Sequence, residues 1–169
     1  MATSKPIVGI IMGSDSDLPI MQEASAVLTE YGVAHELRVL SAHRVPEDTA
    51  SYAKRARSRG LKVLIAGAGG AAHLAGVLAA HATVPVIGVP LAGTVFQGTD
   101  AFLATLQMPP GVPVATMSVG KWGARNAGIL ALQILAVADR RLASRLDRMK
   151  QDMRASVLEK DRWLRQPRP

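Results

Sequence analysis

Residues 7–31 read IVGIIMGSDSDLPIMQEASAVLTEY, and this stretch decides the fold class. Ile7–Met12 is almost continuously apolar, as expected for a strand that helices cover on both faces. The polar loop Gly13–Asp17 follows, and the pattern after it predicts a helix over Leu18–Tyr31. The stretch is therefore predicted to begin a βαβ unit.

The same alternation of apolar runs and helical patterns continues along the chain, which predicts an α/β fold with a parallel sheet. Further strands are predicted at His35–Leu40, Lys62–Ala66, Val86–Val89 and Val112–Val119. Further helices are predicted at Pro46–Arg59, Ala71–His81, Asp100–Leu106 and Gly123–Ala138. We predict one domain over 1–169, with a core at about 6–138, an extra C-terminal helix at about 139–155 and a frayed end.

Composition and charge narrow the possible functions. The formal charge is +7, but residues 139–169 hold ten Lys and Arg against five Asp and Glu, which gives +5 there. Acidic residues are interleaved with the bases and no aromatic series accompanies them, so nucleic acid is not the expected partner. The sequence has no Cys and no apolar stretch long enough for a membrane span, so a cytoplasmic protein without a membrane partner is predicted.

The first of three loops that follow predicted strands is Gly13–Asp17. Ligands of open parallel sheets bind outside the carboxyl ends of the strands, so polar residues in these loops are candidates for a site. Backbone amides and the hydroxyls of Ser14 and Ser16 suit an anion, whereas Asp17 suits sugar hydroxyls. The alternative is that Ser16 or Asp17 only caps the following helix.

The second loop is Ser41–Arg44. Arg44 carries a planar guanidinium group that suits phosphate, and Ser41 adds a hydroxyl. His43 has the side chain whose ordinary pKa lies closest to neutrality, as proton transfer requires. A purely structural His43 is the alternative, but its position between Ser and Arg at a strand end favours function.

The third loop is Gly67–His73, which reads GAGGAAH. A loop with so few side chains lets a ligand lie against the backbone, and amides at the start of the next helix can bind a carboxylate. The alternative is that the glycines only permit a tight turn. The spacing does not match the dinucleotide fingerprint. His43 and His73 have no acidic cluster beside them, so no metal site is predicted.

The three loops together resemble those of one enzyme family. GSDSD, SAHR and AGAGGAAHLAG, followed by QMPPGVPVAT and GKWGARNAGILALQILA, are similar to the class I 5-(carboxyamino)imidazole ribonucleotide mutases over Ile7–Ala138. The resemblance implies a flavodoxin-like three-layer sandwich, assembled as a homo-octamer. It implies that a carboxylate moves from the exocyclic nitrogen to ring carbon four of a purine-pathway nucleotide, without metal or other cofactor.

The resemblance also implies roles for residues. His43 corresponds to the proton shuttle. Nucleotide binding falls to Ser14, Asp17 and Arg44, with Ser16 and Ser41 beside the phosphate. The side-chain-poor turn with Gly69, Gly70 and Ala71 is expected to hold the migrating carboxyl group as trapped carbon dioxide, and His73 is expected to shape that pocket.

Two places depart from the family pattern. In the first, Ala75 and Val77 stand where the family usually has Pro and Met. In the second, LAGTVFQGTDAF at Leu91–Phe102 lacks the usual Ser-containing segment and G-x-D-S-L sequence. A divergent paralogue that acts on another heterocyclic carboxylate is therefore an alternative. A non-catalytic nucleotide-binding module is another, and so is the class II branch of the family, which uses free carbon dioxide.

Overall fold

Within residues 5–166, which this computed structural model describes, five parallel strands form one sheet in the order β2-β1-β3-β4-β5. The strands are β1 Val8–Met12, β2 His35–Val39, β3 Val63–Gly69, β4 Val86–Leu91 and β5 Ala115–Thr116. The helices are α1 Leu18–Glu30, α2 Pro46–Arg59, α3 Leu74–His81, α4 Thr99–Leu106, α5 Lys121–Ala136 and α6 Arg140–Leu164. The strand order is that of flavodoxin-like folds.

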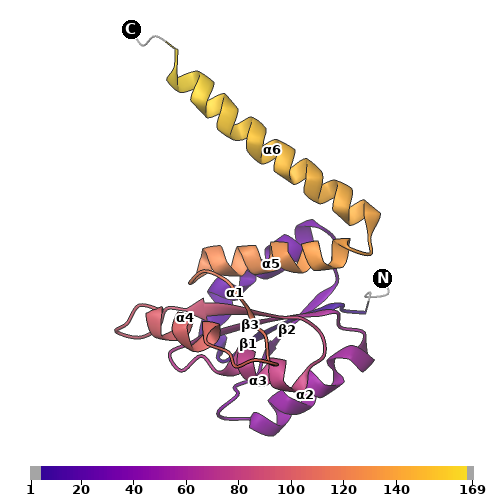
Figure 1. Ribbon diagram of the computed structural model, residues 1–169, viewed down its shortest axis with the longest axis vertical. Helices are drawn as coiled ribbons and strands as arrows, with labels where there is room; N and C mark the ends of the chain where they lie inside the picture. The colour runs from indigo at the N-terminus through magenta and orange to yellow at the C-terminus, as the bar shows by residue number, and fades with distance from the viewer. Residues whose placement is uncertain (1–4, 167–169) are drawn as a thin grey trace. The chain divides into compact units, whose positions relative to one another are not determined.

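Helices cover both faces of this sheet, so the predicted three-layer sandwich is confirmed. Figure 1 shows α1 and α5 on one face and α2 and α3 on the other. A Cβ atom placed on Gly128 of α5 would lie 3.0 Å from Cβ of Val27 of α1, which places these two helices in direct contact. The absence of a side chain at Gly128 permits this close approach.

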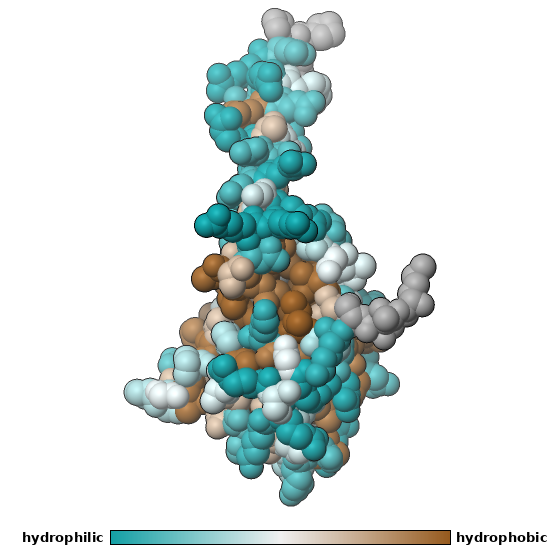
Figure 2. All heavy atoms as spheres, turned by 90° about the vertical axis from the view of Figure 1, so that its right-hand side faces the viewer, coloured by the Kyte–Doolittle hydropathy of each residue, from teal (hydrophilic) through white to brown (hydrophobic). Residues whose placement is uncertain are grey.

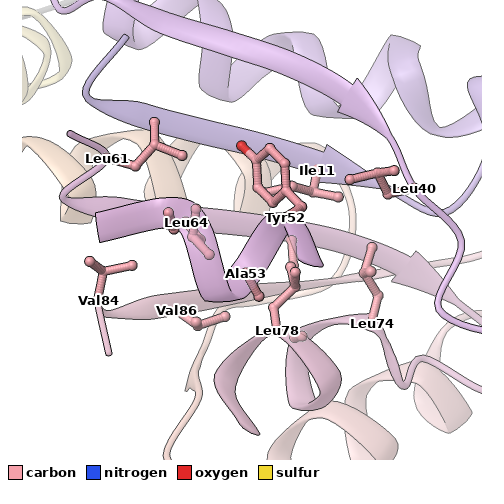
Figure 3. Close-up of a cluster of buried hydrophobic side chains, with 13 residues drawn as sticks. Ile11, Leu40, Tyr52, Ala53, Leu61, Leu64, Leu74, Leu78, Val84 and Val86 are labelled. Carbon is pink, nitrogen blue, oxygen red and sulfur yellow. The ribbon is translucent and has the colours of Figure 1, made fainter. Parts of the chain in front are cut away.

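A buried hydrophobic cluster fills the space between the sheet and the layer formed by α2 and α3 (Figure 3). Leu64 of β3 and Leu78 of α3 are fully buried within it, and Tyr52 of α2 is only 4% exposed. The cluster fixes α2 and α3 against the strands, and thereby the loops that lead into these helices.

The two edge strands differ most from what the sequence predicted. The apolar side chains of β2 are not fully covered, since Leu37 is 37% and Val39 52% exposed. β2 is an edge strand that pairs only with β1, so fewer neighbours cover it. The last strand was predicted over Val112–Val119 but is confined to Ala115–Thr116, and Pro113 lacks the backbone donor that a longer ladder needs.

The chain divides into two compact units, 1–132 and 133–169. The second unit contains α6, which begins at Arg140. Asp139 caps this helix, because its carboxylate accepts hydrogen bonds from the amides of Arg141 and Leu142. α6 continues to Leu164, so the predicted helix end at about residue 155 is wrong. Of the predicted frayed end, residues 167–169 lie outside the described residues.

The surface of α6 is mixed. Hydrophilic side chains dominate it, with apolar side chains between them (Figure 2, top). Met153, Val157 and Leu164 are each more than half exposed. Among the described helices, none is long and apolar enough to cross a membrane.

Gly88 of β4 gives a direct test of the packing between the sheet and α3 and α4. A Cβ atom there would contact Cγ2 of Thr105 and lie 2.9 Å from Val114 and 3.3 Å from Ala75. A Gly88→Val variant is therefore expected to lose about 1–3 kcal/mol of unfolding free energy through overpacking, as measured by urea denaturation. The matched control is Gly93→Ala, whose Cβ would meet no atom within 4 Å. An equal loss in both variants would contradict the packing argument.

Candidate active site

The three loops identified in the sequence line one cavity of about 490 Å³ at the carboxyl edge of the sheet. It lies where strand order reverses, between β1 and β3, which is the usual ligand position in such folds. The predicted residues that line it are Ser14, Asp17, Ser41, His43, Arg44, Gly69, Gly70 and Ala71. Ser16 and His73, which were also predicted, are not part of its lining.

The first loop is a short 3-10 turn, Asp15–Asp17, with Ser14 as its cap. Oδ2 of Asp17 accepts a hydrogen bond of 3.0 Å from the amide of Ser14. The hydroxyl of Ser16 donates to Oγ of Ser14 at 2.9 Å, so Ser16 supports Ser14 from outside the cavity. Asp17 thus both organises this turn and lines the cavity. Its side chain makes no capping hydrogen bond to α1, which was the alternative that the sequence left open.

The environment of Asp17 disfavours its charged form. Burial raises the pKa of this carboxyl, and hydrogen bonds from the amides of Ser14 and Gly13 offset the rise only in part. A carboxyl whose pKa is higher in the folded than in the unfolded state stabilises the fold at low pH, and this contribution is lost as pH rises through the folded pKa.

An Asp17→Asn variant tests this electrostatic cost, because the amide oxygen can still accept the hydrogen bond from Ser14. Relative to the parent, the variant is expected to gain unfolding free energy as pH rises from about 3 to 7. Urea denaturation of both proteins at the two pH values measures the difference. A difference that stays constant with pH would contradict the raised pKa.

In the second loop, Arg44 bridges to the first. Its Nη2 donates to the Gly13 carbonyl at 2.9 Å, and its Nε donates to Oγ of Ser41 at 3.3 Å. The remaining guanidinium donors stay available at the cavity wall. Ser41 therefore orients Arg44 in addition to lining the cavity. Pro46, at the first position of α2, ends the loop directly after Val45.

The third loop is shorter than the sequence predicted. Gly67, Ala68 and Gly69 belong to β3, and α3 begins at Leu74 rather than at Ala71. Parallel pairing with β4 continues as far as Gly69 and Leu91, because a glycine leaves room for the neighbouring backbone. A Cβ atom on Gly69 would lie only 3.0 Å from the Leu91 carbonyl oxygen.

The turn from Gly70 to His73 has a defined set of backbone donors. Gly70 has a φ of +59°, which glycine adopts without strain. The amides of Ala72 and His73 donate back to the carbonyls of Gly70 and Ala71 at 2.9 and 2.8 Å. The amides of Ala72 and His73 are therefore used within the turn, so a ligand would meet the backbone of Gly70 and Ala71 rather than free amides at the helix start.

His43 and His73 form a pair. Nε2 of His43 lies 2.9 Å from Nδ1 of His73, with the two rings nearly perpendicular. One proton lies between these nitrogens, so each imidazole constrains the tautomer of the other. When His43 donates from Nε2, its Nδ1 keeps a lone pair and can act as a base. His73 thus acts through His43 and does not line the cavity.

A fourth loop, which joins β4 to α4, completes the lining through Gly93 and Thr94. Oγ1 of Thr94 donates to Oδ2 of Asp100 at 2.7 Å, and this hydrogen bond lowers the pKa of Asp100. The sequence indicated this loop only through its departure from the family pattern. The other lining residues that were not predicted as site residues are Gly13, Ala42, Ala68 and Leu74.

The remaining histidines lie elsewhere. The ring of His35 contacts Ser25 Oγ at 2.7 Å and the Val33 carbonyl at 2.9 Å, and His81 ends α3. In the described part of the chain, no three His, Cys, Asp or Glu side chains gather as a metal ion would need.

The fold and the cavity define a flavodoxin-like α/β protein with a polar ligand site at its topological switch point. The family model described as AIR carboxylase matches residues 7–156, and the chain belongs to this family.

Curated relatives and solved structures agree with this assignment. The chain is 49% identical to the N5-carboxyaminoimidazole ribonucleotide mutase of Pyrococcus horikoshii, over 97% of this chain and 92% of the relative. It is 54% identical to the mutase of the same name from Bacillus subtilis, over 92% of this chain and 96% of the relative. The crystal structure of Treponema denticola PurE superposes with a TM-score of 0.85 at 26% identity, over 95% of this chain and 99% of that one.

Proposed function

We propose that this chain is an isomerase of de novo purine synthesis that converts N5-carboxyaminoimidazole ribonucleotide into 4-carboxy-5-aminoimidazole ribonucleotide. The observation that carries the proposal is the placement of His43 and Arg44, neighbours on one loop, in the same cavity as the glycine-rich turn. About 50% identity to mutases of that name over most of the chain supports it.

The nucleotide part of the substrate suits the first two loops. Arg44 supplies a charged donor for the phosphate, and its bonds to Gly13 and Ser41 hold it in place. Ser14 and Ser41 add hydroxyls, with Ser16 behind Ser14. Asp17 accepts hydrogen bonds from the ribose hydroxyls. The substrate is thus a small-molecule nucleotide, anchored away from the glycine-rich turn.

The carboxyl group migrates beside that turn. Protonated His43 donates its proton to the exocyclic nitrogen as the bond from nitrogen to the carboxyl carbon breaks, which releases carbon dioxide. The backbone of Gly70 and Ala71, which lines the cavity, confines the carbon dioxide next to the ring. Carbon four then attacks it, a new carbon–carbon bond forms, and neutral His43 removes the proton from carbon four. His43 ends in its initial state, and no metal or other cofactor enters these steps.

A spectroscopic assay tests the activity and the branch of the family together. The full chain is expected to convert N5-carboxyaminoimidazole ribonucleotide, and to be far less active on aminoimidazole ribonucleotide with bicarbonate. The reverse preference would assign the chain to the branch that uses free carbon dioxide. Binding of the nucleotide with no turnover of either substrate would favour a non-catalytic binding module.

A divergent paralogue is the second candidate, and the fourth loop favours it. Gly93 and Thr94 line the cavity where the family usually has a Ser-containing segment. Such an enzyme would turn over another heterocyclic carboxylate in preference to the imidazole ribonucleotide. A comparison of kcat/KM for the two kinds of substrate distinguishes these candidates.

The assembly forms part of the same proposal. We propose a homo-octamer of single-domain subunits, each spanning 1–169, in the cytoplasm. The exposed apolar side chains of α6, among them Met153, Val157 and Leu164, support self-association. Native mass spectrometry of the full chain is expected to give the mass of eight copies, and a monomer at micromolar concentration would refute the octamer.

A further inference from the structure

A second cavity, of about 570 Å³, lies behind the Ser41–Arg44 loop and shares no lining residue with the candidate active site. The edge strand β2 and Leu40 directly after it form one wall, and α2 with its cap residue Val45 forms the other. Its lining residues are Arg38, Val39, Leu40, Val45, Asp48, Tyr52, Arg55 and Arg59. The lining of this cavity thus contains three guanidinium groups but only one carboxylate, that of Asp48.

The spacing of residues on α2 explains why these side chains meet. Asp48, Tyr52, Arg55 and Arg59 are separated by four, three and four positions, which places them on one face of the helix. Tyr52 is buried beneath this face and is part of the core cluster (Figure 3). Arg38 reaches the same place from β2, with its guanidinium carbon 5.8 Å from the centre of the Tyr52 ring. The arginine side chains therefore lie over a buried, well-packed residue.

One of the three arginines is held by the protein itself. Nη2 of Arg59 donates to Oε2 of Glu36 at 2.8 Å, and the hydroxyl of Tyr52 donates to Oε1 of Glu36 at the same distance. Burial alone would raise the pKa of Glu36, but these hydrogen bonds outweigh it and lower the pKa. Glu36 is thus an ionised group that is hydrogen-bonded to Arg59 and Tyr52, and it also attracts the charge of Arg38.

The other two arginines have no hydrogen-bonded partner of this kind. In the described part of the chain, neither Arg38 nor Arg55 forms a salt bridge or a side-chain hydrogen bond. Like charges around one cavity repel each other, and the guanidinium group is the side chain that best matches phosphate oxygens. A bound polyanion would relieve this repulsion and use donors that the protein leaves open.

We propose that this cavity, hereafter the arginine cavity, is a second binding site that takes a di- or triphosphate group through Arg38 and Arg55. The phosphates lie between β2 and α2, with Arg59 at the far end and Asp48 at the rim near the start of α2. The ligand is either free polyphosphate or a nucleoside that carries the di- or triphosphate group. This proposal does not depend on the chemistry proposed for the first cavity.

Isothermal titration calorimetry of the full chain with tripolyphosphate and, separately, with ATP tests the site. The double variant Arg38→Gln/Arg55→Gln is expected to raise the Kd of the second site by about tenfold or more, since it removes charge-assisted hydrogen bonds. Both arginines are exposed, so the fold is expected to persist. Equal affinity for both probes would identify the phosphates as the whole recognised group, and a preference for ATP would identify a nucleotide ligand.

Two controls separate the arginine cavity from general attraction and from the first cavity. Lys54→Gln removes an exposed positive charge from another face of α2 and is expected to leave the Kd unchanged. Arg44→Gln is expected to weaken binding at the first cavity only. No binding of either probe beyond the first cavity, or an equal loss in Lys54→Gln, would overturn the proposal.

Discussion

A His43→Asn variant is expected to keep its fold and its affinity for the nucleotide but to lose about 10²–10⁴-fold in kcat, the range that general acid–base catalysis supplies. His43 lines the cavity, and its Nε2 is bound to His73, so Nδ1 is the nitrogen left to exchange a proton with the substrate. Asn can form hydrogen bonds at this place, but it cannot accept and return a proton near neutral pH. Steady-state turnover of N5-carboxyaminoimidazole ribonucleotide measures the effect.

Two further variants separate proton transfer from positioning. His73→Phe removes the partner of Nε2 and is expected to lower kcat less than His43→Asn, with a displaced pH profile, because the tautomer of His43 is then no longer fixed. His73→Asn offers an oxygen in place of Nδ1 and is expected to restore part of the rate. His81→Asn, at the exposed end of α3, is the control that leaves kcat unchanged. A folded His43→Asn variant with the kcat of the parent would contradict the proposed mechanism.

The main features of the site were predictable because they depend on chain order and on local pattern. Polar residues directly after Met12 and Leu40 follow strands, and the carboxyl ends of parallel strands share one edge of a sheet. That reasoning alone brings Ser14, Asp17, His43 and Arg44 to one cavity. Pro46 at the start of α2 likewise follows from its fixed φ and its missing donor.

What sequence reasoning missed depends on contacts between distant segments. His43 and His73 lie 30 residues apart, and their hydrogen bond requires the order in which β1, β2 and β3 are placed. Their pairing leaves no local periodic signal. The exposure of Val39 also depends on the strand order, because β2 lies at an edge of the sheet and pairs only with β1. Thr94 lines the cavity from the loop after β4, outside the three loops that hold the predicted site residues.

The second large effect is expected at Arg44, where Arg44→Gln should raise KM by about 10²-fold and change kcat much less. Two charge-assisted hydrogen bonds to a phosphate are worth about 3 kcal/mol or more, which corresponds to that factor. An interaction made equally with the bound substrate and with the transition state appears in KM rather than in kcat. Arg44 is exposed, so unfolding free energy is expected to change by only about 0.5 kcal/mol.

Arg44→Lys distinguishes charge from geometry. Lysine keeps the positive charge but cannot at once reach the Gly13 carbonyl and Oγ of Ser41, as the guanidinium group does. It is therefore expected to recover only part of the loss and to leave KM about tenfold above the parent value, which corresponds to the loss of one hydrogen bond. Full recovery by lysine would mean that the phosphate is attracted by charge alone. The bridge from Arg44 to the first loop would then serve the fold of the two loops rather than the substrate.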